Sequence, residues 1–158
     1  MDSAANNFAM ADMAIRKPID EVFEAFIDPA ITTKFWFTKS SGKLEAGKQV
    51  EWTWEMYNLT VPVFVKEIQG NEKISLEMGS GDQKSSVEWQ FKALNPSKTF
   101  VTITNYDLPG TGDDLINQIR DSTGGFTIVL AGLKAYLEHG IELNLVLDKY
   151  PKELMESD

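Results

Sequence analysis

The chain has 158 residues, of which 42% are hydrophobic, and its formal net charge is −9 at pH 7. Proteins bind nucleic acids largely by neutralising phosphates, so this charge argues against a nucleic-acid partner and against anionic membrane surfaces. The sequence has no cysteine, which excludes disulfides, thiolate zinc sites and a cysteine nucleophile.

The N-terminal residues lack the basic and apolar stretches of a secretory signal, and no apolar run approaches the roughly 18 residues of a membrane span. We therefore expect a cytoplasmic protein. The length suits one domain, so we expect a single domain over residues 1–158, with residues 1–7 disordered.

The N-terminal third is predicted to contain one strand and two short helices. The strand is expected over residues 8–16, and Pro18 with the two acids that follow suits a helix start. Apolar residues then repeat with helical spacing, at Ile19, Val22, Phe23 and Phe26. An Asp-Pro pair at 28–29 ends this helix. A second helix is expected over 30–34, before a polar loop at 38–42.

The middle of the chain alternates between apolar and polar residues in short segments separated by turns. This pattern predicts strands over residues 50–57, 61–68, 74–78, 86–92 and 101–106. Pro62 indicates that the second of these strands starts irregularly or lies at a sheet edge. The short connections predict an antiparallel meander with one face in water and one face buried.

The apolar spacing then changes from two residues to that of a helix. A helix is predicted from Asp113, as cap, to His139, with Gly140 as the residue that ends it. At a rise of 1.5 Å per residue it would be about 40 Å long, and only the sheet could cover its apolar stripe. Residues 141–147 again alternate apolar side chains and are expected to form a short tail packed nearby. Gly124-Gly125, inside the helix, suggests a flexible gate, close approach of a ligand to the backbone, or close packing against the tryptophans of the sheet.

This order of elements is that of an α+β helix-grip fold, in which a curved antiparallel sheet of six or seven strands wraps around a long C-terminal helix. The sequence resembles the START-like (SRPBCC, Bet v 1-like) superfamily, near the group related to the activator of the Hsp90 ATPase (AHSA1-like). The residues that carry the resemblance are Ile15, Pro18, 22–29, Phe35-Trp36, Gly47-Lys48, Trp52, Trp54, 99–108, Gly125-Phe126, Leu130, Leu133, 136–138 and Gly140. The group usually has Trp where Phe126 stands and a second Gly where Lys48 stands, and a smaller aromatic side chain at 126 would reshape a cavity.

The resemblance implies a ligand cavity between the sheet and the long helix. The residues expected to line it are Trp36, Trp52, Trp54, Trp89, Phe91, Ile103, Asn105, Phe126, Val129, Leu130 and Leu133. An equally simple interpretation is that these aromatic residues form an ordinary core. Asn105 is the polar residue expected on the inward face, where it would orient a ligand or bond to backbone or water.

The sequence and the resemblance together favour a protein that binds a small hydrophobic or aromatic ligand without catalysis. Two alternatives remain: an enzyme similar to polyketide cyclases or hydrolases, and a chaperone-regulating protein with a chaperone or homodimer partner. Glu55 is the next polar candidate for acid–base chemistry, but the alternation points it outward. His139 is the only histidine, and its place at a helix end favours a charge–dipole role. We expect no catalytic residue, cofactor or metal.

Overall fold

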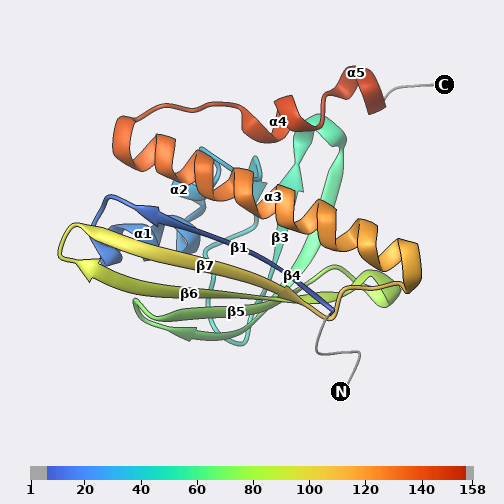
Figure 1. The fold of residues 1–158 in the computed structure, drawn as a ribbon, viewed down its shortest axis with the longest axis horizontal. Helices are drawn as coiled ribbons and strands as arrows, with labels where there is room; N and C mark the ends of the chain where they lie inside the picture. Colours follow the sequence, from blue (N-terminus) through green and yellow to red (C-terminus); the bar gives the residue numbers. More distant parts are fainter. Residues whose placement is uncertain (1–6, 156–158) are drawn as a thin grey trace.

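The computed structural model describes residues 7–155, and within them seven antiparallel strands form one curved sheet in the order β1-β7-β6-β5-β4-β3-β2 (Figure 1). The strands are β1 (Phe8–Ile15), β2 (Lys39–Ser40), β3 (Gln49–Trp54), β4 (Leu59–Gln69), β5 (Lys73–Met78), β6 (Ser85–Asn95) and β7 (Lys98–Tyr106). The predicted meander is confirmed.

Of the segment expected to be disordered, residues 1–6 lie outside the described residues. Asn7 is held in place, because its amide donates a 2.6 Å hydrogen bond to the carbonyl of Leu108.

Two details of the sheet differ from the prediction. The expected polar loop at 38–42 contains β2, which pairs with the end of β3 and is too short to show alternation. The strand predicted to run to residue 57 ends at Trp54, where the chain enters a single 3-10 turn, η2 (Glu55–Tyr57). A second such turn, η3 (Gly81–Gln83), lies between β5 and β6.

Pro62 lies four residues into β4, an interior strand of the sheet. The first four residues of β4 pair only with β3, since pairing with β5 begins at Val63. Pro62 therefore sits where β4 is locally an edge and needs no backbone N–H for a second neighbour, and its carbonyl accepts a hydrogen bond from Gly79.

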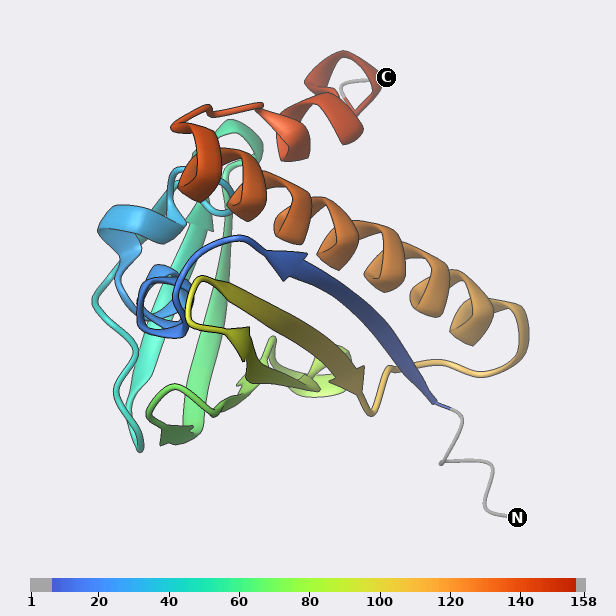
Figure 2. The ribbon, with the colours of Figure 1, turned by 60° about the vertical axis from the view of Figure 1, so that its left-hand side comes forward.

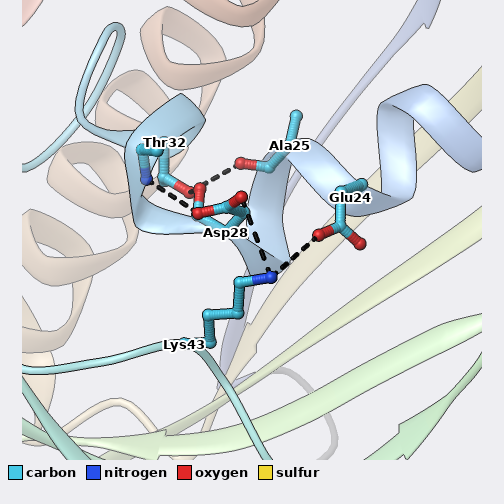
Figure 3. A network of polar contacts seen from close by, with 6 residues as sticks. Glu24, Ala25, Asp28, Thr32 and Lys43 are labelled. Atoms are coloured by element: carbon cyan, nitrogen blue, oxygen red, sulfur yellow. Dashed lines mark hydrogen bonds and ion pairs between the residues drawn. The ribbon is translucent and has the colours of Figure 1, made fainter.

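The helices α1 (Ile19–Ile27) and α2 (Pro29–Thr32) form a corner after β1. The Thr32 hydroxyl donates to the carbonyl oxygens of Ala25 at 2.6 Å and Asp28 at 3.0 Å. Outside the corner, the Lys43 ammonium lies 3.7 Å from Glu24 and 3.9 Å from Asp28 (Figure 3). This corner fixes the direction of the chain into the aromatic residues at 35–37.

The long helix α3 (Gly112–His139) crosses one face of the sheet, while β3 and β4 rise beside it (Figure 2). Its extent and its end at Gly140, which has a φ of 66°, are confirmed. The predicted cap is wrong: Thr111 is the capping residue, without a side-chain hydrogen bond, and Asp113 and Asp114 lie in the first turn. There their charges still favour the positive end of the helix dipole.

The tail, here residues 141–155, folds back beside α3 toward the tip of the β3–β4 hairpin (Figure 1). It contains two short helices, α4 (Leu145–Lys149) and α5 (Lys152–Met155), where the sequence suggested only alternating apolar residues. The expectation that it packs nearby is confirmed by the contacts described below.

The inward side chains of the sheet, of α1 and of α3 form one buried hydrophobic cluster. Its largest fully buried members include Trp52, Trp89 and Phe37, and the Phe37 and Trp52 rings stack 4.5 Å apart. No helix among residues 7–155 is long and apolar enough to cross a membrane.

Candidate functional site

An apolar recess of about 350 Å³ lies between α3, the β3–β4 end of the sheet and the tail. Its lining residues are Trp36, Trp54, Tyr57, Leu59, Val61, Met78, Ser122, Gly125, Phe126, Ile128, Val129, Val146, Tyr150 and Met155. Leu59 and Met155, at 47% and 54% exposure, bring part of this lining to the protein surface. The recess is thus an indentation with an apolar wall, reachable from solvent.

A second recess of about 390 Å³ adjoins the apolar one under the first half of α3; it is called the polar recess here because six polar side chains are part of its lining. Its lining residues are Val61, Met78, Gly79, Gln83, Ser85, Asn105, Leu108, Pro109, Gln118, Asp121, Ser122 and Phe126. Four residues, Val61, Met78, Ser122 and Phe126, line both recesses. The two are therefore halves of one trough between sheet and helix, with different chemistry at each end.

Asn105 and Ser122 connect the sheet to α3 where the two recesses meet. The Asn105 amide nitrogen donates to the Ser86 carbonyl at 2.9 Å and to the Ser85 hydroxyl at 3.0 Å, and the Ser122 hydroxyl donates to the amide oxygen at 2.9 Å. Alternation along β7 correctly predicted that Asn105 points inward, and it is only 6% exposed. Its amide bonds to backbone and to side chains from two other elements, so a buried polar group is satisfied.

The aromatic wall of the apolar recess comes from three separate segments. Trp36 follows α2, where its backbone N–H bonds to the Thr32 carbonyl; Trp54 ends β3; and Phe126 lies mid-way along α3. The Trp36 ring centroid lies 5.7 Å from that of Phe126 and 6.4 Å from that of Trp54, both edge-on. Such edge-to-face contacts are favourable and hold the wall in one arrangement.

The eleven residues predicted to line a cavity divide into two groups. Those that line a recess are Trp36, Trp54, Asn105, Phe126 and Val129. Those that line neither recess and are packed in the buried cluster are Trp52, Trp89, Phe91, Ile103, Leu130 and Leu133. Trp54 and Val129 of the first group also belong to the buried cluster, and a ligand-binding role for the predicted residues remains a prediction.

Several lining residues were absent from the sequence-based set. Ser122 precedes Phe126 by one helical turn, so helical spacing could have placed it on the same face of α3. Tyr57 and Tyr150 could not be found in this way, because the tail's position depends on long-range contacts. The Tyr57 hydroxyl donates to the Tyr150 carbonyl at 2.6 Å.

The two adjacent glycines inside α3 lie against the tail. A Cβ atom at Gly124 would meet the end of Lys149 at 3.4 Å, and one at Gly125 would meet the Tyr150 hydroxyl at 3.5 Å. Both glycines therefore face the tail, and the predicted packing against the sheet tryptophans is wrong. Close approach to the core occurs at Gly132, where a Cβ atom would lie 3.1 Å from that of Phe35.

Ionisable groups in the trough are few. Burial and the neighbouring Tyr150 raise the pKa of Tyr57, and burial and the negative charge of Asp121 raise the pKa of Tyr150. Both phenols are therefore neutral at pH 7. Among the described residues that line the two recesses, Asp121 carries the one charge, and none is lysine, arginine or histidine.

The other polar candidates lie outside the trough. Glu55 is exposed, as alternation predicted, and His139 lies in the last turn of α3, where its Nε2 is 3.8 Å from Glu138. Residues 7–155 contain no group of three or more histidine or acidic side chains arranged to hold a metal ion.

Comparison with known proteins shows which family has this sequence pattern. The sequence model for Activator of Hsp90 ATPase homolog 1-like proteins matches residues 16–138. No curated protein matches the chain at a significant level.

Solved structures share the fold. Protein SSP2350 from Staphylococcus saprophyticus is 29% identical, with a TM-score of 0.73 over 86% of this chain and 95% of that one. DynU16, from the dynemicin biosynthetic locus, is 18% identical, with a TM-score of 0.75 over 86% of this chain and 49% of that one. The Aha1 dimer from Colwellia psychrerythraea is 17% identical, with a TM-score of 0.70 over 84% of this chain and 97% of that one. By the extent of the sequence match and by its START-like helix-grip fold, the chain belongs to the family of Activator of Hsp90 ATPase homolog 1-like proteins.

Proposed function

We propose that the chain binds a small apolar molecule with an aromatic portion in the apolar recess, without catalysing a reaction on it. The observation that carries this proposal is the wall formed by Trp36, Trp54 and Phe126 around a volume of about 350 Å³. Small-molecule sites are typically concave, mostly apolar and of about 300–1,000 Å³. The recess has this size and character.

The ionisable groups favour binding over catalysis. General acid–base catalysis works best with a group whose pKa is close to the operating pH. The pKa values of Tyr57 and Tyr150 are raised from an already high ordinary value, so neither phenol exchanges a proton readily at pH 7. Asp121 is exposed, and it is the one charged residue among those that line the polar recess in the described part of the chain. A cyclase or hydrolase would need a convergent acid and base, which these residues do not supply.

The proposal is tested by filling the recess. Val61 lines both halves of the trough, whereas its neighbour Thr60 is exposed on the other face of the sheet. We expect saturable quenching of tryptophan fluorescence by some member of a panel of small lipids, aromatic compounds and polyphenols, and loss of it in Val61→Phe. The control Thr60→Phe adds the same ring outside the trough and should bind like the wild type.

Native mass spectrometry of freshly purified protein gives an independent measurement, since a carried ligand adds its mass. Equal quenching in Val61→Phe and the wild type would place the ligand elsewhere. A response to no compound, together with an unliganded mass, would contradict the binding function. A changed mass of a compound after incubation would instead reveal an enzyme.

A second candidate function is interaction with an Hsp90-type chaperone, as the family description suggests. The structural observation that favours it is an exposed apolar group on the outer face of the sheet, formed by Phe8, Met10 and Tyr106 at 38%, 48% and 40% exposure. An ATPase assay of a purified Hsp90-type chaperone, with and without the chain, tests this function. Stimulation lost in Met10→Glu but kept in Leu94→Glu, at another exposed apolar side chain, would support it.

A further inference from the structure

The hydrogen bonds of Asn105 fix the chemistry that the trough presents to a ligand. The Ser86 carbonyl can only accept a hydrogen bond, so the amide group facing it at 2.9 Å must be the nitrogen of Asn105. The amide oxygen then faces Ser122, and the Ser122 hydroxyl must donate its proton across that 2.9 Å contact. With its proton used, the Ser122 oxygen offers only lone pairs to the trough.

Ser122 is well placed to meet a ligand because it lines both recesses. A compound with its apolar body against Trp36, Trp54 and Phe126 reaches Ser122 where the lining changes from apolar to polar. The hydroxyl of Ser85 and the side chains of Gln83 and Gln118 line only the polar recess. Ser122 is therefore the polar side chain of α3 that such a compound meets in the apolar half.

Two other hydroxyls line the apolar recess, those of Tyr57 and Tyr150. The Tyr150 hydroxyl lies beside Gly125, and the charge of Asp121 acts on it. The Tyr57 hydroxyl donates its proton to the Tyr150 carbonyl at 2.6 Å, so it too offers only lone pairs to the trough. Asp121 is itself only an acceptor. Ser122, Tyr57 and Asp121 thus present acceptors, and no cationic side chain lines either recess in the described part of the chain.

From these contacts we propose that the trough selects an apolar aromatic compound carrying a hydroxyl or N–H donor, which bonds to Ser122, and that it rejects carboxylates. This inference rests on the proposed binding function and specifies its ligand class. A carboxylate would bring no proton for Ser122, would face Asp121, and would lose its hydration without a cation to replace it. An ether of the same shape would fit but would leave Ser122 without its donor.

The test compares three naphthalenes that share one ring system and differ in the group at position 2: 2-naphthol, 2-methoxynaphthalene and 2-naphthoate. Each is titrated at pH 7 into 15N-labelled protein, and the amide signals of residues 122–126 report binding at the junction. A net hydrogen bond of ordinary strength predicts that the naphthol binds about fivefold more tightly than the ether. The unpaired charge predicts that the naphthoate binds roughly tenfold more weakly than the ether, or more weakly still.

Two variants assign the preference to Ser122. Ser122→Ala removes the acceptor and should bring the naphthol and the ether to nearly equal affinity. Thr123→Ala is the matched control, because Thr123 is exposed and its hydroxyl donates to Ile119 within α3. The control should keep the wild-type order of the three compounds.

The outcomes separate this inference from the proposed function. Binding of all three compounds with equal affinity, or tightest binding of the naphthoate, would overturn the donor selection and leave ligand binding intact. Binding of none of them, with no response to the wider panel, would overturn both. Should Ser122→Ala fail to fold, the order of the three compounds on the wild-type protein still decides the question.

Discussion

Tyr57 and Tyr150 join two segments that lie far apart in the sequence: the Tyr57 hydroxyl donates a 2.6 Å hydrogen bond to the Tyr150 carbonyl. A longer contact of 3.3 Å runs from the same hydroxyl to the Val146 carbonyl. Val146 and Tyr150 both line the apolar recess, and both lie beyond residues 16–138, which match the family. The tail therefore adds a wall to the recess that the matched region does not include.

Replacing Tyr57 with phenylalanine should loosen this wall. Tyr57→Phe removes the hydrogen bonds to the tail and keeps the ring, so we expect the free energy of unfolding to fall by about 1 kcal/mol. Amide hydrogen exchange should accelerate over residues 145–155 and stay unchanged in β6 and β7. Tyr106→Phe is the control, because the Tyr106 hydroxyl makes no hydrogen bond to another described residue. Unchanged exchange in the tail would show that its apolar contacts alone hold it.

Two glycines of α3 should respond in opposite ways to alanine. Gly124→Ala removes the helix penalty of glycine, about 1 kcal/mol, and its new Cβ meets only the flexible end of Lys149, so the variant should be more stable. Gly132→Ala gains the same propensity, but its Cβ would lie 3.1 Å from that of Phe35 and 3.3 Å from the Phe35 carbonyl. The overpacking costs about 1–3 kcal/mol, so we expect a net loss of stability. Thermal unfolding of both variants measures the contrast, and equal effects would contradict it.

The two tryptophans of β3 should differ in the cost of truncation. Trp52 is 1% exposed and stacked on Phe37, whereas Trp54 is 8% exposed and lines the apolar recess. Trp52→Ala should cost about 3–5 kcal/mol, the usual figure for a packed core aromatic. Trp54→Ala should cost clearly less, about 2 kcal/mol, because its ring packs on fewer sides. Urea unfolding gives both values, and equal costs would mean that Trp54 is packed as tightly as Trp52.

Much of this fold follows from periodicity in the sequence. The long strands and α3 each repeat a pattern for enough residues to define it, and alternation placed Asn105 inward although it is polar. The two residues of β2 are too few to show alternation, and the five residues of α4 complete little more than one helical turn.

The candidate site was predictable only in part. Alternation identifies which side chains face inward, but not which of them touch each other and which border a space. Trp52 and Trp54 have the same pattern. They differ in that Phe37 stacks on Trp52 but meets Trp54 edge-on, and in that only Trp54 lines the apolar recess. Tyr57 contacts Tyr150 because segments far apart in the sequence pack together, and the spacing of neighbouring residues does not predict such a contact. The polar junction at Ser122 depends on the same kind of contact between α3 and the sheet.

Glu138 holds the C-terminal end of α3 against the end of β1. Its carboxylate accepts a 2.7 Å hydrogen bond from the Arg16 backbone N–H and another of 2.7 Å from the Lys134 ammonium. Burial alone would raise the pKa of this carboxyl, but the Lys134 and Arg16 hydrogen bonds, with the charges of Lys134 and His139, hold it below its ordinary value. The charged form is thus favoured in the folded protein.

A pKa that is lower in the folded than in the unfolded chain stabilises the fold above the unfolded value, about 4.3 for glutamate, and this stability is lost as the pH falls through the folded value. At pH 7, Glu138→Gln should therefore lower the free energy of unfolding by about 1–2 kcal/mol, because charge-assisted hydrogen bonds are replaced by neutral ones. As the pH falls below the unfolded value toward the lower folded value, the wild type loses this stabilisation, so the difference between the two proteins should shrink. Denaturant unfolding between pH 3 and pH 7 measures this, with the exposed Glu142→Gln as control. A difference that stays constant over that range would mean that Glu138 acts through shape and not through charge.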